Sequence, residues 1–156
     1  MIPETKPDGL KALLILHRAM LVGQLIFAII AFYLVYSRSF VVGLQPSTGK
    51  ILQVITLIFS AAGYYAGNYL FKKKLDQINE MRTAQEKFDL YKGACLLQWI
   101  LIEVPCIFSI ICFLLTRNYA FFALAIVLML LFTMLAPSKL KMILHLQLNE
   151  KEIGEL

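Results

Sequence analysis

The amino-acid sequence predicts an all-α integral membrane protein, a four-helix antiparallel bundle, and three observations support this fold class. Hydrophobic residues make up 60% of the 156 residues and charged residues 16%, whereas a soluble domain has about 45–50% and about 25%. The mean hydropathy is +0.73. Four apolar runs are long enough to cross a hydrocarbon core of about 30 Å as helices, and none alternates with the period of two that a barrel strand requires.

The four predicted membrane helices span residues 12–36, 51–71, 95–116 and 119–136 of a single membrane domain, 1–156. Asp8 is positioned to cap the first helix.

The segments between these helices differ in composition. The loop 37–50 contains two Gly and a Pro and is predicted to be a short exposed turn. Residues 72–92 lack both, so we expect the second and third helices to continue as a cytoplasmic helical hairpin that turns near residues 82–84. Arg117 and Asn118 alone link the third and fourth helices. Residues 138–153 follow Pro137 and predict an amphipathic tail helix.

The distribution of basic residues predicts the orientation in the membrane. With four spans, the N-terminal segment, the hairpin and the tail share one side. Of the 15 Lys and Arg residues, all lie on that side except Arg38, Lys50 and Arg117. The excess of Lys and Arg places both termini in the cytoplasm. No signal-peptide cleavage site follows the first apolar run, so we expect an uncleaved multi-pass protein of the bacterial cytoplasmic (inner) membrane.

The third run, Cys95–Thr116, contains Glu103, the only acidic residue inside a long apolar stretch. An ionised carboxylate there costs about 2.5 kcal/mol or more unless it is protonated, paired or open to water. Three interpretations stay open: a hydrogen-bonded carboxyl that fixes helix register, a protonatable or cation-binding site, and a carboxyl that meets a partner's helix. Pro105 lies close by and removes the amide that would bind the Leu101 carbonyl, which tends to kink a helix.

Four polar residues are expected at the depth of Glu103: Gln24 on the first helix, and Tyr64, Tyr65 and Asn68 on the second. Buried polar groups in a bilayer must satisfy one another. We therefore predict a polar layer around Glu103.

Two further residues near the cytoplasmic end of the first helix are candidates for an ion or proton site. His17 has an ordinary pKa of about 6.5 that suits a proton relay toward Glu103, although an interfacial His beside an Arg more often faces lipid headgroups. Arg18 is expected to snorkel to the interface, and it is also the nearest candidate counter-ion for Glu103.

A stripe of small residues on the second helix predicts close helix packing, either within the monomer or between copies. The stripe contains a GxxxG motif, which lets another backbone approach, and its members are Thr56, Ser60, Gly63 and Gly67. The three cysteines, by contrast, have neither metal-ligand spacing nor a nearby His. We expect them to fill core space, and we expect no metal site and no cofactor.

The motifs that are missing narrow the function. The chain has no nucleotide-binding glycine loop, no HExxH motif and no paired carboxylates in a membrane span. We therefore do not expect the protein to be an enzyme or to have catalytic residues. Basic residues beside membrane spans suit the lipid bilayer and its anionic headgroups at the hairpin, and we expect no nucleic-acid partner. Two functions remain: a packing or assembly subunit that binds a membrane-protein partner or a second copy, and a proton- or cation-coupled transport component that uses Glu103.

Two resemblances follow from these residues. The segment ILIEVPCIFSIICFLL resembles in outline the carboxylate-bearing helix of rotary ATPase proteolipids, which implies a proton-carrying Glu, but Val104 and Pro105 stand where proteolipids have small residues. The whole chain, with its RN turn at 117–118 and PSK segment at 137–139, resembles an uncharacterised family of small four-span membrane proteins of Bacteroidetes-type bacteria. That resemblance implies a four-span fold and no known activity.

Overall fold

The computed structural model describes residues 9–38, 46–77 and 83–146, and these residues form five helices and no strand. The helices are α1 (Gly9–Tyr36), α2 (Pro46–Leu75), α3 (Ala84–Thr116), α4 (Tyr119–Met134) and α5 (Lys139–Leu146). The all-helical prediction is therefore confirmed for the described part of the chain.

Three of these helices, α1, α2 and α3, are long and apolar enough to cross a membrane. The helix α4 provides a fourth candidate span when it is taken together with α5, from which it is bent by 69°. At 1.5 Å per residue, the 33 residues of α3 extend for about 50 Å, which exceeds a hydrocarbon core of about 30 Å. The polar start of α3 therefore has room to extend beyond the apolar layer.

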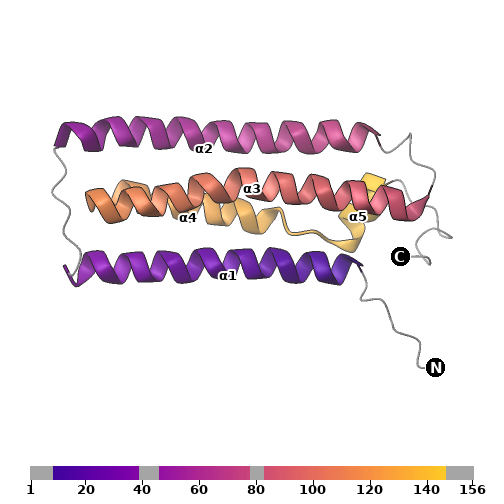
Figure 1. The fold of residues 1–156 in the computed structure, drawn as a ribbon, viewed down its shortest axis with the longest axis horizontal. Helices are drawn as coiled ribbons and strands as arrows, with labels where there is room; N and C mark the ends of the chain where they lie inside the picture. The colour runs from indigo at the N-terminus through magenta and orange to yellow at the C-terminus, as the bar shows by residue number, and fades with distance from the viewer. Residues whose placement is uncertain (1–8, 39–45, 78–82, 147–156) are drawn as a thin grey trace, which may run out of the picture.

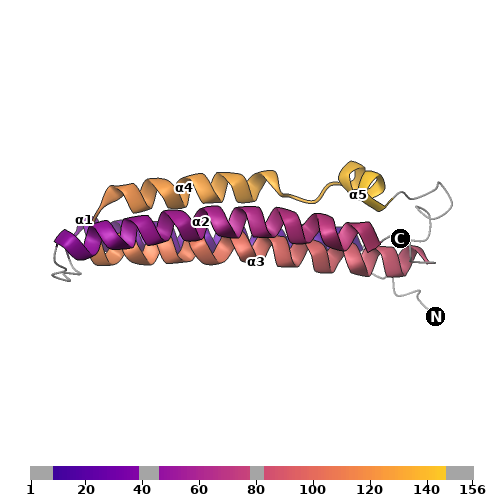
Figure 2. The same cartoon turned by 90° about the horizontal axis from the view of Figure 1, so that it is seen from above.

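The helix α3 lies at the centre of the molecule. Figure 1 shows α1 and α2 on opposite sides of α3, and Figure 2 shows α4 against one face of this three-helix layer. The helix α3 contacts each of the other four helices. The start of α1 and the whole of α5 lie at the same end of the molecule (Figure 1).

The ends of α3 are fixed by local hydrogen bonds. Thr83 and Glu86 form a capping box, in which the Thr83 hydroxyl accepts the Glu86 amide at 3.2 Å and the Glu86 carboxylate accepts the Thr83 amide at 3.2 Å. At the other end Arg117 adopts a left-handed conformation with φ of 55°, and Asn118 caps α4 by accepting the Ala120 amide at 3.0 Å. The link between α3 and α4 is therefore only two residues long.

Several boundaries differ from the predictions. The expected loop 37–50 is wrong at its end, because α2 begins at Pro46, and a proline fits the first helical turn, where its missing amide has no partner. The expected cap Asp8, most of the hairpin turn and residues 147–153 of the tail lie outside the described residues.

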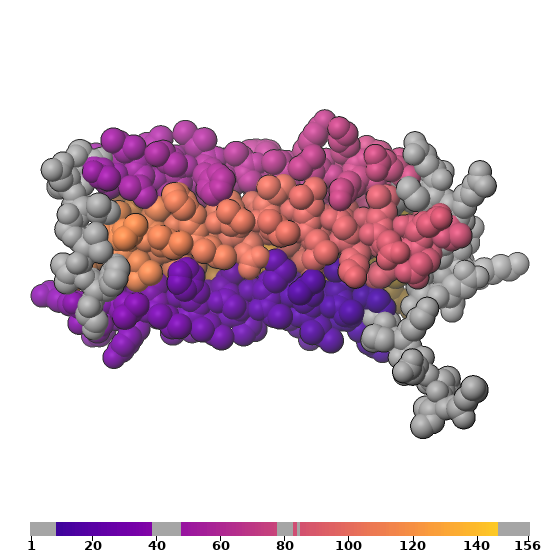
Figure 3. Space-filling model, in the orientation of Figure 1, coloured from indigo at the N-terminus to yellow at the C-terminus, as the bar shows by residue number. Residues whose placement is uncertain are grey.

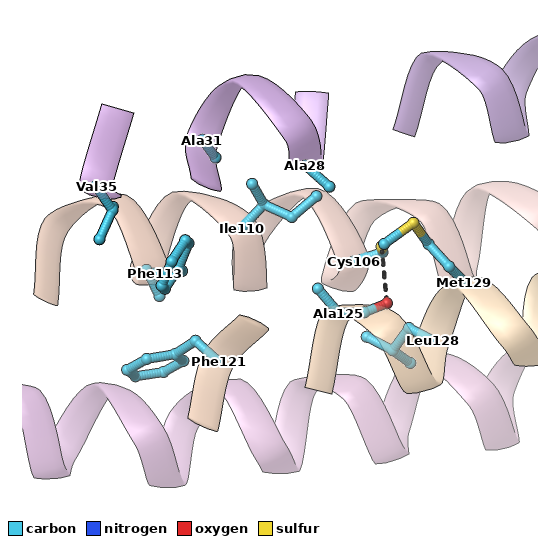
Figure 4. Packing of buried hydrophobic residues seen from close by; sticks show 11 residues of the cluster. Ala28, Ala31, Val35, Cys106, Ile110, Phe113, Phe121, Ala125, Leu128 and Met129 are labelled. Atoms are coloured by element: carbon cyan, nitrogen blue, oxygen red, sulfur yellow. Dashed lines mark hydrogen bonds between the residues drawn. The ribbon is translucent and has the colours of Figure 1, made fainter. Parts of the chain in front are cut away.

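The core between α1, α3 and α4 is made of apolar side chains of mixed size (Figure 4). Ala28 and Ala31 allow α1 to approach α3 closely, while Phe113 and Phe121 fill the space between α3 and α4. Within this core the Cys106 thiol donates to the Ala125 carbonyl at 3.6 Å. All three cysteines are buried and free.

Candidate functional site

The polar residues predicted around Glu103 form two separate pairs. The half-buried side chain of Glu103 has Gln24 of α1 as its polar neighbour. Asn68 of α2 instead accepts a hydrogen bond of 2.8 Å from the Gln98 amide. The single layer is therefore wrong for Asn68, because Gln98, five residues before Glu103 on α3, offers an amide partner. Tyr64 packs edge-on against Tyr65, with ring centroids 5.8 Å apart.

Gln24 is only 2% exposed and is, with His17, one of two polar residues on the buried face of α1. It lies close enough to Glu103 to act on its carboxyl, yet neither the nitrogen nor the oxygen of its amide meets a hydrogen-bond partner within the described residues. A buried amide without a partner costs about 1–3 kcal/mol. The seam between α1 and α3 therefore holds an incompletely satisfied polar pair.

Glu103 has no ion pair among the described residues. Arg18, the predicted counter-ion, is exposed and does not bridge to it in the described structure. A half-buried carboxyl without a cation is costly at membrane depth. It requires a proton, water or a hydrogen-bond donor.

His17 lies in the core, 3% exposed, so the alternative in which it faces lipid headgroups is wrong. Its ring stacks on Phe132 at 4.5 Å and meets Trp99 edge-on at 4.9 Å. Its Nε2 lies 3.0 Å from the Phe132 carbonyl oxygen, and because a carbonyl only accepts, this nitrogen carries the proton. Phe132 is in the last turn of α4, and its carbonyl also accepts the Leu135 amide at 3.0 Å, so His17 adds a second donor at this helix end. His17 therefore caps α4 and is not directed toward Glu103.

The small-residue stripe of α2 packs against α3. A Cβ on Gly63 would collide with the Leu101 carbonyl oxygen and come within 2.9 Å of the Pro105 ring, and one on Gly67 would lie 3.4 Å from the Gln98 carbonyl. Pro105 deprives the Leu101 carbonyl of its helical donor, and the backbone of Gly63 covers that oxygen. Gly63 of α2 and Pro105 of α3 therefore belong to one close contact between the two helices, the Gly63–Pro105 contact.

The two hydroxyl members of the stripe are buried in the same interface. Thr56 donates to the Leu52 carbonyl at 2.7 Å and lies 3.6 Å from the Cys112 sulfur. Ser60 donates to the Thr56 carbonyl at 2.7 Å. Each hydroxyl thus donates its hydrogen bond to a backbone carbonyl of its own helix, and needs no polar partner on α3. This lets α2 and α3 pack closely.

One face of α3 remains uncovered. Figure 3 shows the surface of α3 between α1 and α2 along the side opposite α4. Ile100, Val104 and Ile111 are exposed on α3, and their spacings of four and seven residues place them on one helical stripe. Glu103 is adjacent to Val104 and half-buried, so its carboxyl borders this face.

Sequence reasoning did not find a cavity of about 580 Å³ between α2, α3 and α5. Its lining includes Lys72 of α2, Gln98 of α3 and Lys141 of α5. The run Lys72–Lys74 was a signal for basic chemistry at this end of α2, but only the folded chain brings α5 against it. Partial burial, and secondarily Lys141, lowers the pKa of His145 on α5.

No protein-family model, curated protein or solved structure matches this chain.

Proposed function

We propose that this chain is a small non-enzymatic integral membrane protein, a four-span antiparallel bundle of the bacterial cytoplasmic membrane with both termini inside. Two contacts support antiparallel packing: Thr56 meets Cys112 whereas Asn68 meets Gln98, so α2 and α3 run in opposite directions. The excess of Lys and Arg at the end that holds the start of α1 and α5 supports the orientation. Anionic headgroups would contact that basic end.

Within the membrane, the chain acts as an assembly subunit whose uncovered α3 face binds a helix of a membrane-protein partner. The observation that carries this proposal is Glu103, which is half-buried next to the exposed Val104 and has no ion pair in the described structure. A partner helix with a hydrogen-bond donor at this depth would cover the apolar stripe and satisfy the carboxyl together. Interhelical hydrogen bonds in membranes contribute roughly 0.6–2 kcal/mol each, and close packing adds to this.

Photo-crosslinking in native membranes tests the proposed interface. A photoreactive residue is placed at Val104 on the uncovered face, or at Val127 of α4 as a matched control; these valines are 47% and 51% exposed. We expect a discrete protein adduct from position 104 and none from position 127. Glu103→Ala should reduce the adduct roughly tenfold because the polar anchor is lost, whereas Glu103→Gln should retain most of it.

Equal adducts from both positions, or an adduct that Glu103→Ala leaves unchanged, would show that the interface does not lie on this face. An adduct with twice the mass of the chain would identify the partner helix as a second copy.

The orphan amide of Gln24 favours a second candidate function, a proton- or cation-coupled transport component with Glu103 as the carrier. An amide and a carboxyl that leave hydrogen-bonding capacity open at membrane depth resemble an ion or proton site. Glu103→Gln separates the two functions, since it mimics the protonated form. The variant should fold in both cases, and only transport predicts that it abolishes proton flux into proteoliposomes containing the purified protein.

A further inference from the structure

The cavity between α2, α3 and α5 has mixed chemistry. Its polar lining includes Lys72, Asp76 and Lys141, and its apolar lining includes Phe71, Leu135 and Leu144. A volume of about 580 Å³ lies within the range of about 300–1,000 Å³ that holds small ligands. The cavity therefore suits a molecule with one charged and one apolar part.

The two lysine side chains that line the cavity lie on two different helices. Lys72 is the first of three consecutive lysines in the last turn of α2, where the apolar run ends, and this is the depth of lipid headgroups. Lys141 on α5 is held in place, because its ammonium donates to the Met134 and Ala136 carbonyls at 3.0 and 3.2 Å. The cavity thus has a positive end at the membrane interface.

The inner wall offers further hydrogen-bonding groups. The Gln98 amide donates to Asn68, and Gln98 is 5% exposed. This bond uses the Gln98 nitrogen and the Asn68 oxygen. Among the described residues the Asn68 side-chain nitrogen has no hydrogen-bond partner. It is therefore free to donate a hydrogen bond to an anionic oxygen of a ligand.

Aromatic rings and aliphatic side chains form the rest of the wall. The ring of His145 lies 5.5 Å from Phe71 and 6.2 Å from Tyr91, which fixes α5 over the cavity. Asp76 contributes a negative charge. It disfavours a ligand with two negative charges, such as free phosphate or a phosphomonoester, relative to a singly charged phosphodiester.

We propose that this cavity binds one phospholipid molecule through its phosphodiester, with Lys72, Lys141 and Asn68 around the headgroup and an acyl chain along Phe71, Leu135 and Leu144. This site is independent of the α3 interface described above. It differs from general attraction between a basic surface and anionic lipid, because two lysines line the cavity while their neighbours Lys73 and Lys139 do not.

Native mass spectrometry of the full chain in mild detergent, titrated with phosphatidylglycerol, tests the site. Lys72→Gln and Lys141→Gln should each weaken lipid binding roughly tenfold, as expected for loss of a charge-assisted hydrogen bond. The controls Lys73→Gln and Lys139→Gln remove the same charge on the same elements and should change binding less than twofold.

A second pair of variants keeps the test independent of charge. Leu144→Trp enlarges a side chain that lines the cavity and should abolish lipid binding, whereas Leu140→Trp, equally exposed on the same short helix but outside the cavity lining, should leave it intact. The helix content of each variant is compared by circular dichroism. Equal losses from cavity and control variants would overturn the site in favour of diffuse electrostatic attraction. Displacement of the lipid by inorganic phosphate would overturn it in favour of a free-anion site.

Discussion

At the scale of single residues, His17 contributes to stability more than its position in the sequence indicates. Its side chain on α1 hydrogen-bonds to the Phe132 carbonyl of α4, and its ring packs between Phe132 and Trp99. The sequence could not predict this, because the partner is a backbone carbonyl 115 residues away. A backbone carbonyl carries no signature in a residue pattern.

Replacing His17 by Leu should lower the free energy of unfolding by about 1–2 kcal/mol, through loss of one hydrogen bond and the ring contacts. The measurement is reversible unfolding of the purified protein in mixed micelles with increasing sodium dodecyl sulfate. Arg18→Gln is the control, because Arg18 is exposed, and it should change stability by less than about 0.5 kcal/mol. If His17→Leu is as stable as this control, the α4 cap does not stabilise the fold.

At the scale of elements, the Gly63–Pro105 contact between α2 and α3 combines two features that lie far apart in the sequence. The GxxxG motif predicts close packing, and Pro105 predicts an unsatisfied Leu101 carbonyl. The structure brings them together, because the missing side chain of Gly63 lets the α2 backbone cover that oxygen. The helix α3 continues through Pro105 without interruption.

Gly63→Ala should destabilise the protein by about 1–3 kcal/mol, since its new methyl group meets a backbone carbonyl that cannot rotate away. Gly23→Ala is the matched control, because a Cβ there would contact nothing within 4 Å, and it should be neutral or stabilising by up to about 1 kcal/mol. The same unfolding assay compares them. Equal stability of the two variants would mean that α2 and α3 do not pack at the Gly63–Pro105 contact in the membrane.

At the scale of the whole molecule, sequence patterns predicted which segments are helical but not how the helices share their contacts. Apolar runs determine span lengths, and the Arg117–Asn118 link requires α3 and α4 to be neighbours. The central position of α3, with α1 and α2 on either side, depends on small side chains such as Ala28 and Gly63 that meet α3 from opposite sides. Hydropathy alone cannot distinguish this arrangement from a closed ring of four helices.

The candidate site was likewise predicted only in part from the sequence. Glu103 and Gln24 were predicted as neighbours because equal distance from the helix ends gives equal depth, and depth follows directly from residue count. Asn68 was misassigned, because residue count gives only an approximate depth and does not show which side chain of α3 lies opposite; the structure pairs Asn68 with Gln98. The cavity beneath α5 was missed because it requires a tail helix to fold back against α2 and α3.

Mass-spectrometric mapping of carbodiimide labelling at Glu103 tests the central claim most directly, with Glu103→Gln as the background control. If a partner helix covers the α3 face, Glu103 should resist labelling in native membranes at all pH values and become labelled after detergent separates the complex. Strong labelling in native membranes near neutral pH that fades with alkali would contradict the assembly role. It would instead identify an open, proton-exchanging carboxyl, as the transport function requires.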